Sequence, residues 1–291
     1  MEESIRKSDI LIEALPYIQA FRGKVIVAKY GGSAIDNPTA MRGILQDLIF
    51  LSAVGIRSVL VHGGGPAITQ QLSAAGRKTA FVDGMRVTDA ATVRIVNQAL
   101  TDVNRRLVEQ IIALGGEAEG IIARDHVVVA QPHPKAGHLG FVGTVQTVRT
   151  GPIRDVFVHH AIPVISPVGS LDRQLYNINA DVVASAVATH LKAEKLVLLT
   201  NVRGILRQAN DVNSLISTLS VKEAKLLMDR QVIQEGMIPK VKACMEALRK
   251  GVKKTHIIDA AIPHAMLVEI FTKKGIGTEI VRGEALKPIS C

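Results

Sequence analysis

The stretch Val25-Ile26-Val27-Ala28-Lys29-Tyr30-Gly31-Gly32-Ser33 is the segment around which the chain is organised. Its first four residues are apolar and mostly β-branched, which predicts a buried strand. A lysine and two glycines follow at the carboxyl end of that strand, where open α/β sheets bind their ligands. The glycines let backbone N–H groups approach an anion, and Lys29 adds a movable positive charge. The stretch predicts a phosphate cradle, with a tight turn beside a solvated lysine as the alternative.

A second stretch repeats this pattern further along the chain. The apolar run Val59-Leu60-Val61 leads into His62-Gly63-Gly64-Gly65-Pro66. Proline suits the first turn of a helix, so a strand, a glycine loop and a helix N-terminus follow one another. Free N–H groups at such a terminus favour anions, which predicts a second anion site. The run also resembles the oxyanion loop of esterases, but the chain lacks the G-x-S-x-G motif which that chemistry needs.

Composition narrows the class of protein. The 291 residues are 47% hydrophobic and 21% charged, enough for one large α/β domain or two coupled lobes. The net charge of +9 is spread along the chain and only 3% of residues are aromatic, which favours small anionic substrates over nucleic acid. Two cysteines make neither a disulfide framework nor a metal set. With no signal peptide and no apolar run of membrane length, we expect a soluble cytoplasmic protein.

The order of the remaining elements predicts a mostly parallel sheet with helices on both faces. Residues 3–20 form an amphipathic helix that Pro16 should kink or break. Beyond the two glycine loops, helices are expected near 88–114, 152–161, 177–192, 239–251 and 265–272, and strands at 164–165, 195–199, 256–258 and 279–281. Residues 118–148 are interpreted as hairpins. Strand and helix alternate, as in an α/β fold, with a lobe boundary near residue 185.

Three polar residues stand out by their context. Asp181 begins a helix beside two asparagines, where helix capping is the alternative role. Arg86 lies in a turn, and its planar fork suits a carboxylate, although a surface salt bridge is the alternative. Lys240 lies at a helix start, where the dipole disfavours a cation unless an anion is near.

Five motifs occur in order along nearly the whole chain: Lys29-Tyr30-Gly31-Gly32-Ser33-Ala34, His62-Gly63-Gly64-Gly65-Pro66, Arg86-Val87-Thr88-Asp89, Tyr176-Asn177-Ile178-Asn179-Ala180-Asp181 and Gly236-Met237-Ile238-Pro239-Lys240-Val241. Together they resemble the amino-acid kinase family, and within it the acetylglutamate kinases. The resemblance implies a three-layer α/β/α sandwich around a mainly parallel open sheet. It also implies ATP-dependent phosphorylation of the side-chain carboxylate of N-acetyl-L-glutamate to the acyl phosphate, the second step of arginine biosynthesis.

The resemblance also implies roles for particular residues. Lys29 and Lys240 would flank the transferring phosphoryl group, with Asp181 holding both lysines in place. The substrate would be bound by Gly64, Gly65, Arg86 and Asn177. The nucleotide would be bound by Gly31, Gly32, Thr200, Asn201, Gly204 and Met237. Magnesium would arrive on the ATP phosphates, without a dedicated set of protein ligands.

Regulation is the last implication of the resemblance. Arginine-inhibited members carry an extra N-terminal helix, and residues 3–20 match it; a helix that merely covers the core is the alternative. The matching arginine site would comprise Tyr17, His256, Glu269 and Gly275. The implied division is a helix for oligomerisation at 1–22, an acyl-amino-acid and dimerisation lobe at 23–184, and an ATP lobe at 185–291. The assembly would be a hexamer, a trimer of dimers, with no nucleic-acid or membrane partner. Whether a signalling protein binds is left open.

Some positions depart from the family pattern. Asn201 stands where many relatives have aspartate, Glu235-Gly236 replaces a common Gly-Gly, and Asp83-Gly84 replaces Asn-Gly. The first departure concerns contacts to the ribose or the metal shell. Two alternatives remain open: a related kinase for a carrier-linked aminoadipate, and an inactive regulatory member of the family.

Overall fold

The computed structural model describes residues 2–283 except 33–34, 36, 209–210 and 273–274, so Ser33 and Ala34 of the first motif and Cys291 lie outside the described residues. The strands are β1 (Val25–Tyr30), β2 (Arg57–His62), β3 (Phe81–Val82), β4 (Met85–Arg86), β5 (Ala118–Ile121), β6 (Val128–Pro132), β7 (Gly143–Val148), β8 (Ile162–Ile165), β9 (Val168–Leu171), β10 (Gln174–Asn177), β11 (Lys195–Thr200), β12 (Thr218–Ser220), β13 (Lys254–Asp259) and β14 (Thr278–Val281).

The α-helices of the described residues are α1 (Glu2–Phe21), α2 (Pro38–Ala53), α3 (Gly65–Ala74), α4 (Ala90–Ala113), α5 (Ala136–Leu139), α6 (Thr150–Val158), α7 (Ala180–His190), α8 (Val221–Asp229), α9 (Ile238–Arg249) and α10 (Ala265–Phe271). Short 3₁₀ turns lie at η2 (Ala123–Asp125), η3 (Val212–Ser214) and η4 (Glu235–Met237). The expected helices and central strands are confirmed within a few residues at each end.

The central sheet has β1 in its interior. Within the described residues its eight strands run in the order β12-β14-β13-β11-β1-β2-β8-β5. Neighbours from β13 to β5 pair in parallel, while β14 is antiparallel to β13. The chain winds from β1 to β2 on one side and later adds β11 on the other. The mainly parallel sheet is thus confirmed, and its order reverses beside β1, where such sheets bind ligands.

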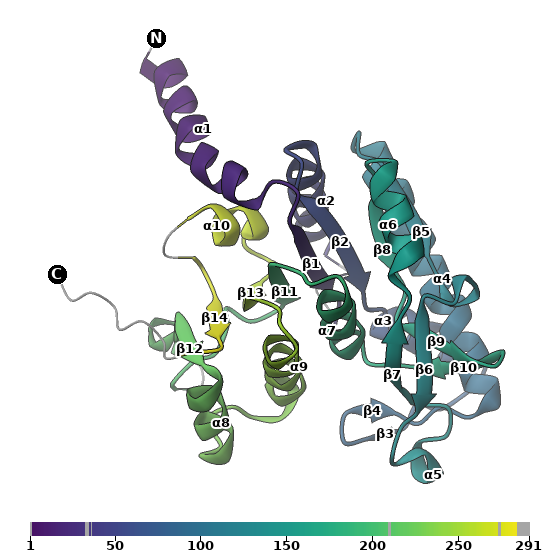
Figure 1. The fold of residues 1–291 in the computed structure, drawn as a ribbon. Coiled ribbons are helices and arrows are strands. Elements are labelled where there is room, and N and C mark those ends of the chain that lie inside the picture. The colour runs from purple at the N-terminus through teal and green to yellow at the C-terminus, as the bar shows by residue number, and fades with distance from the viewer. Residues whose placement is uncertain (1, 33–34, 36, 209–210, 273–274, 284–291) are drawn as a thin grey trace.

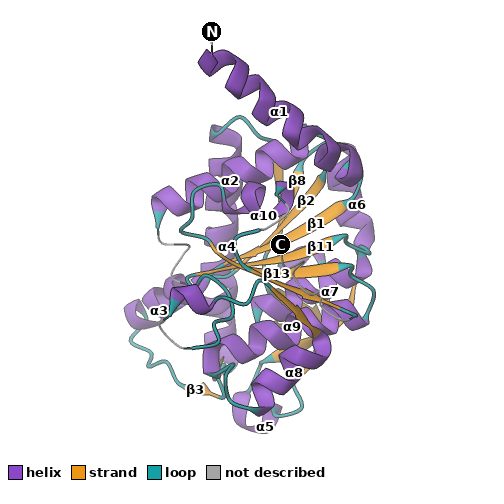
Figure 2. Ribbon diagram, turned by 90° about the vertical axis from the view of Figure 1, so that its left-hand side faces the viewer, coloured by secondary structure: helices purple, strands orange, loops and turns teal. Residues whose placement is uncertain are grey.

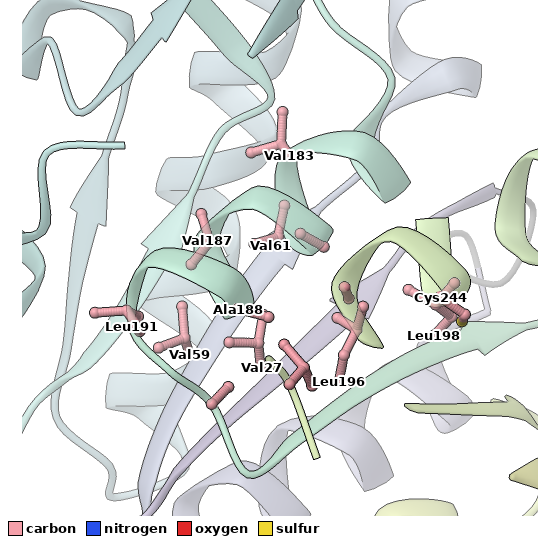
Figure 3. Close-up of a cluster of buried hydrophobic side chains, with 14 of the residues drawn as sticks. Val27, Val59, Val61, Val183, Val187, Ala188, Leu191, Leu196, Leu198 and Cys244 are labelled. Atoms are coloured by element: carbon pink, nitrogen blue, oxygen red, sulfur yellow. The ribbon is translucent and has the colours of Figure 1, made fainter. Parts of the chain in front are cut away.

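Helices cover both faces of this sheet. Side chains alternate along each strand, so Val27 packs into one cluster with α7 and α9 while Ile26 packs into another with α2 and α10. Figure 3 shows the first cluster, in which Val27, Val59 and Leu196 from three strands meet Val187 of α7. The strands lie edge-on between the two helical layers in Figure 2. The three-layer α/β/α expectation is confirmed.

A second sheet, in the order β10-β9-β6-β7, and the β3–β4 hairpin lie beside the first one (Figure 1). The interpretation of residues 118–148 as hairpins is correct for β6 and β7, which pair antiparallel. It is wrong for β5, which is the parallel edge strand of the main sheet. Its four residues have too short an alternation to distinguish the two arrangements.

Helix α1 extends away from the body of the molecule and reaches it near α10 (Figure 1). Pro16 was expected to kink or break this helix; the break is wrong, because the helix runs unbroken through Pro16. A proline loses its own N–H bond and crowds the carbonyl four residues back, which belongs to Ile12. Ile12 is 67% exposed, so water is available to that carbonyl. No described helix combines the length and apolarity that a bilayer span requires.

Candidate active site

Two lysines and one aspartate from three separate elements meet at the carboxyl edge of the sheet. Lys29 lies near the end of β1, Asp181 in the first turn of α7 and Lys240 in the first turn of α9. The Lys29 Nζ lies 2.9 Å from Asp181 Oδ1, and the Lys240 Nζ lies 2.9 Å from Asp181 Oδ2. Capping of α7 falls to Asn179, whose side chain accepts from the Asp181 N–H at 2.8 Å. The carboxylate of Asp181 therefore binds the two lysines and does not cap α7.

This cluster, the Lys29–Asp181–Lys240 cradle, carries one more positive than negative charge. Lys29 and Asp181 are 6% and 3% exposed. Burial lowers the pKa of Lys29. Burial alone would raise the pKa of Asp181, but the two ammonium groups hold that pKa below its usual range. A buried ionised carboxylate with two cations leaves a surplus positive charge that an incoming anion would neutralise.

The cradle opens on a cavity of about 1420 Å³. Asp181 and Lys240 line it, together with residues from α8, α9 and the β3–β4 hairpin. A cavity of this size holds a ligand as large as a nucleotide together with a second small molecule. The surplus charge therefore faces space that anionic ligands can occupy.

The two glycine loops touch each other through their backbones. A Cβ on Gly31 would lie 2.9 Å from the Cα of Gly63, and the Gly63 N–H donates to Tyr30 O at 2.7 Å. A Cβ on Gly64 would lie 2.5 Å from a methyl carbon of Leu100. Gly64 is the N-cap of α3, whose first amides have no carbonyl partner within the helix. Close approach thus requires glycine at Gly31, Gly63 and Gly64, and the positive φ of 73° favours it at Gly32.

Arg86 lies beside the second glycine loop, and it is 7% exposed. Its guanidinium donates to Thr79 Oγ1 and Thr69 Oγ1, each at 2.9 Å, and to Gly65 O at 3.3 Å. It also lies 4.8 Å from the centre of the Phe81 ring. Among the described residues Arg86 does not form the surface salt bridge considered as its alternative role; these contacts hold the fork in place. Thr69 and Thr79 were not predicted from the sequence, because single threonines carry no distinctive pattern.

Asn177 is connected to Arg86 through Thr88. The Asn177 amide donates to Thr88 Oγ1 at 3.2 Å, and the Thr88 hydroxyl donates to Arg86 O at 2.7 Å. Asn177 ends β10 and Arg86 ends β4, which are far apart in sequence. Thr88 therefore connects the side chain of Asn177 to the backbone of Arg86, the two residues predicted to bind the substrate.

The turn after β11 holds the predicted nucleotide residues at the same sheet edge, since Leu199 pairs with Tyr30. The Thr200 hydroxyl donates to Val202 O at 2.8 Å and stabilises the turn. Gly204 has φ of 145°, and a Cβ there would lie 2.6 Å from a side-chain oxygen of β14. Thr200 and Gly204 are thus explained by the shape of the turn that carries Asn201. Met237 precedes α9, where its N–H donates to Gln234 O at 2.9 Å.

A second buried cluster, the Lys195–His256–Glu269 cluster, lies toward the amino edge of the sheet. Lys195 opens β11, and its Nζ lies 3.1 Å from His256 Nε2. The His256 Nδ1 lies 2.6 Å from Glu269 Oε1. An ammonium only donates, so Nε2 is the bare nitrogen and Nδ1–H donates to Glu269. Burial lowers the pKa of His256. Burial alone would raise the pKa of Glu269, but the neighbouring His256 and the hydrogen bonds from the backbone amides of Ile276 and Gly277 together hold that pKa below its usual range.

The other predicted arginine-site residues surround this cluster. A Cβ on Gly275 would lie 2.7 Å from Glu269 Oε2. The Tyr17 ring of α1 lies 6.2 Å from the ring of Phe271, two residues beyond Glu269 on α10. The structure therefore gathers Tyr17, His256, Glu269 and Gly275 in one region. The sequence analysis missed Lys195; a lysine opening an otherwise apolar strand is the signal that could have found it.

Comparisons with known proteins decide the family. A model described as the amino acid kinase family matches residues 24–259. The chain belongs to the amino acid kinase family. It is 47% identical to the acetylglutamate kinase of Syntrophomonas wolfei over 281 residues, which cover 96% of this chain and 98% of the relative. It is 46% identical to the acetylglutamate kinase of Desulforamulus reducens over 285 residues, covering 97% and 99%.

Solved structures agree with this membership of the amino acid kinase family. The N-acetylglutamate synthase of Neisseria gonorrhoeae, complexed with coenzyme A and N-acetyl-glutamate, is similar with a TM-score of 0.83 and 28% identity. The match covers 94% of this chain and 63% of the synthase, so this chain corresponds to only part of that protein. The carbamate kinase of Giardia lamblia bound to AMP-PNP has a TM-score of 0.67 at 16% identity, a likeness of fold alone.

Proposed function

We propose that this protein phosphorylates the side-chain carboxylate of N-acetyl-L-glutamate with ATP, as a step of arginine biosynthesis. The observation that carries the proposal is the Lys29–Asp181–Lys240 cradle, in which each carboxylate oxygen of one buried aspartate holds a lysine. The acetylglutamate kinases that match nearly the whole chain support the choice of substrate. An inactive regulatory role is disfavoured, because such a role does not need the complete cradle.

The reaction joins two anions, and this determines what the residues must do. The attacking group is already a carboxylate, so no strong base is needed, and catalysis consists of positioning and charge neutralisation. Lys29 and Lys240 approach the phosphoryl group from β1 and α9, and Asp181 fixes the distance between them. Amides of the two glycine loops, at Gly31, Gly32, Gly64 and Gly65, supply further donors.

Magnesium fits the site as a companion of the nucleotide. Both oxygens of Asp181 face lysines, so this carboxylate is not available to a metal ion. Among the residues that the structure describes, no three His, Cys, Asp or Glu side chains are grouped as a metal site requires. When bound with ATP, Mg²⁺ would neutralise part of the phosphate charge. Turn residues of the strand edge, Thr200, Asn201, Gly204 and Met237, would contact the nucleotide.

The acyl amino acid would bind at the other side of the cradle. Arg86 would pair its fork with the α-carboxylate, and Asn177 would bind neighbouring polar groups. This role is supported because, within the part of the chain that the structure describes, the guanidinium of Arg86 contacts two hydroxyls and a carbonyl but no carboxylate. In this proposal residues 23–184 bind the acyl amino acid and residues 185–291 bind ATP.

Feedback inhibition by arginine is the second part of the proposal. Glu269 would accept the guanidinium, with His256 and Gly275 beside it and Tyr17 closing the site from α1. The N-acetylglutamate synthase of Neisseria gonorrhoeae, similar with a TM-score of 0.81, was also solved with L-arginine. Helix α1 exposes Ile5, Leu11, Ile12 and Leu15, an apolar surface that suits exchange with a second copy. Such exchange would link dimers into a ring of six subunits.

Deletion of residues 1–20 tests this second part. We expect an active dimer that no longer responds to millimolar arginine, measured by light scattering and by ADP release. Since coupling between sites is reciprocal, acetylglutamate should weaken arginine binding to the full chain by the same factor. A truncated protein that remains hexameric and sensitive to arginine would contradict the proposal.

A substrate panel tests the main proposal. ADP release is measured with N-acetyl-L-glutamate, glutamate, aspartate and carrier-linked aminoadipate derivatives at matched concentrations. We expect N-acetylglutamate to give the highest kcat/KM. A higher value for an aminoadipate derivative would favour the related carboxylate kinase, and ADP release with none of the acids would favour an inactive member.

A further inference from the structure

A buried histidine that the proposed mechanism does not use lies directly behind the second glycine loop. His62 is the last residue of β2 and pairs with Tyr30 of β1. It is fully buried, at 0% exposure. Its ring is therefore inaccessible to substrates, and any effect on the reaction has to pass through its neighbours.

The hydrogen bonds of His62 fix which of its nitrogens carries the proton. The Nδ1 atom lies 2.8 Å from Gly63 O, and a carbonyl only accepts, so Nδ1 is protonated. Nε2 is then bare, and it accepts from the side-chain amide of Asn104 at 3.2 Å. The same amide group of Asn104 donates to Val164 O at 2.8 Å, which identifies it as the donor end of that side chain. All of these contacts agree on the neutral Nδ1–H tautomer.

The surroundings keep this histidine neutral. Burial, aided by the charge of Arg106, lowers the pKa of His62 to about 4 even though its hydrogen bond to Gly63 acts in the opposite direction. Asn104 is itself buried, at 3% exposure on α4, so the network is almost completely shielded from solvent. The hydrogen bond to Gly63 therefore persists unchanged across the neutral pH range.

The carbonyl held by His62 belongs to the peptide that presents Gly64. In a planar trans peptide the C=O and the following N–H point in opposite directions, so fixing Gly63 O also fixes the Gly64 N–H. A peptide between two glycines has little steric hindrance to rotation, and a rotated peptide would turn its carbonyl toward the incoming anion. The Gly63 backbone also abuts Gly31, the loop that follows Lys29. The orientation of this one peptide thus affects both glycine loops.

We propose that His62, held in its Nδ1–H tautomer by Asn104, is a positioning residue that orients the Gly63–Gly64 peptide so that the amides of the glycine loop face the transferring phosphoryl group. This inference rests on the proposed function for the identity of that group. His62 donates no proton and touches no substrate; it holds the carbonyl away from the anion. Asn104 completes the network by supplying the donor that Nε2 requires.

The first test compares His62→Asn with His62→Leu. These two side chains have nearly the same shape, but only asparagine keeps a donor at the place of Nδ1. Both variants lose the ring, so their thermal midpoints should fall alike. The kcat of His62→Leu should be roughly ten- to a hundredfold below that of His62→Asn, because the amides no longer face the transition state. The KM values for ATP and the acid should be nearly equal in the two variants.

Two outcomes of this comparison overturn the proposal. Equal kcat values would mean that the loop needs no donor behind it. A difference that appears in KM or in thermal stability, and not in kcat, would mean that His62 supports folding or ground-state binding instead.

The second test does not depend on the substrate. Nitrogen-15 NMR of labelled histidine in the wild-type protein should show a protonated Nδ1 and a bare Nε2 for His62 throughout the neutral range. The assignment comes from the signal that is lost in His62→Asn. A protonated Nε2 or a charged ring would overturn the proposal whatever the enzyme phosphorylates. Absence of acetylglutamate-dependent ADP release by the wild-type protein would instead overturn the proposed function, so the two failures are distinguishable.

Discussion

The two buried clusters of charged residues lie toward opposite edges of one sheet and differ in their balance of positive and negative charge. The Lys29–Asp181–Lys240 cradle has two cations on one carboxylate, and it opens on the large cavity. The Lys195–His256–Glu269 cluster has one cation and one carboxylate, joined by a neutral imidazole. Phe21 of α1 covers it, with its ring 5.3 Å from Lys195 Nζ.

The difference shows what marks a candidate site for phosphoryl transfer. Both clusters are buried, and burial lowers the pKa of a lysine in each. Perturbed pKa values alone therefore do not distinguish them. Only the cradle has surplus positive charge facing open space, which an anionic transition state would use. In the balanced cluster the carboxylate of Glu269 instead accepts hydrogen bonds from His256 and from the backbone amides of Ile276 and Gly277.

Loss of the shared carboxylate should have the largest effect on the cradle. In Asp181→Asn two buried ammonium groups remain without their partner, so they repel each other and leave their positions. We expect kcat to fall roughly a thousandfold, with a lower thermal midpoint. Asp172→Asn, the same change in an exposed turn, is the matched control. Equal activity of the two variants would mean that Asp181 does not organise the lysines.

Removal of either lysine should have the next largest effect. Lys29→Ala or Lys240→Ala should lower kcat by a factor of about 10² to 10³, which corresponds to roughly 2.7–4 kcal/mol of transition-state stabilisation. KM should change much less, because the charge matters most when the phosphoryl group is in transit. Lys222→Ala, on the exposed face of α8, controls for loss of one positive charge. A near-normal kcat in either variant would mean that this lysine does not stabilise the transition state.

Arg86→Lys should have a smaller and more selective effect. The charge remains but the bidentate fork is lost, so KM for the acyl amino acid should rise by about tenfold. KM for ATP should change little in the same initial-rate experiment. A rise in both constants would point instead to a collapsed β3–β4 hairpin.

The pH dependence of kcat should follow the cradle. Burial places the pKa of Lys29 below the ordinary 10.5, so its charge, and with it kcat, is lost as pH rises through that lowered value. The two lysines place the pKa of Asp181 below 3.8, so the acid decline should begin only under that pH. Initial rates with both substrates saturating test this. An alkaline midpoint at or above 10.5 would contradict the assigned role of Lys29.

Changes in the balanced cluster should have the smallest effect on the uninhibited rate. Glu269→Gln removes the carboxylate proposed for arginine, so inhibition should be lost while kcat falls far less than in the cradle variants. Glu117→Gln, an exposed residue before β5, is the control. If Glu269→Gln kept its full sensitivity to arginine, the carboxylate of Glu269 would not be needed for regulation.

Local patterns account for most of what the sequence predicted. The apolar run before Lys29 predicted the central strand, and Lys29 with the glycines after β1 and β2 predicted the anion site. Strand ends and close backbone approaches restrict the residue types that fit, so they can be recognised in the sequence. The interactions that were missed are tertiary. Asn104 looked like an ordinary helix residue, and its role depends on β2 and β8 lying beside α4. Lys195 was missed for the same reason, because its partner His256 lies on another strand. The assignment of β5 was wrong because the residues of a strand do not show which strand it pairs with.

Trapping of the acyl phosphate tests most directly whether the cradle, and not the second cluster, is needed for phosphoryl transfer. N-acetylglutamate and ATP are incubated with hydroxylamine and the wild-type protein, Asp181→Asn or Glu269→Gln, and the hydroxamate is quantified. The account predicts strong hydroxamate formation by the wild-type protein and by Glu269→Gln, and formation near background by Asp181→Asn. Equal formation by Asp181→Asn and the wild-type protein, or none by the wild-type protein, would contradict it.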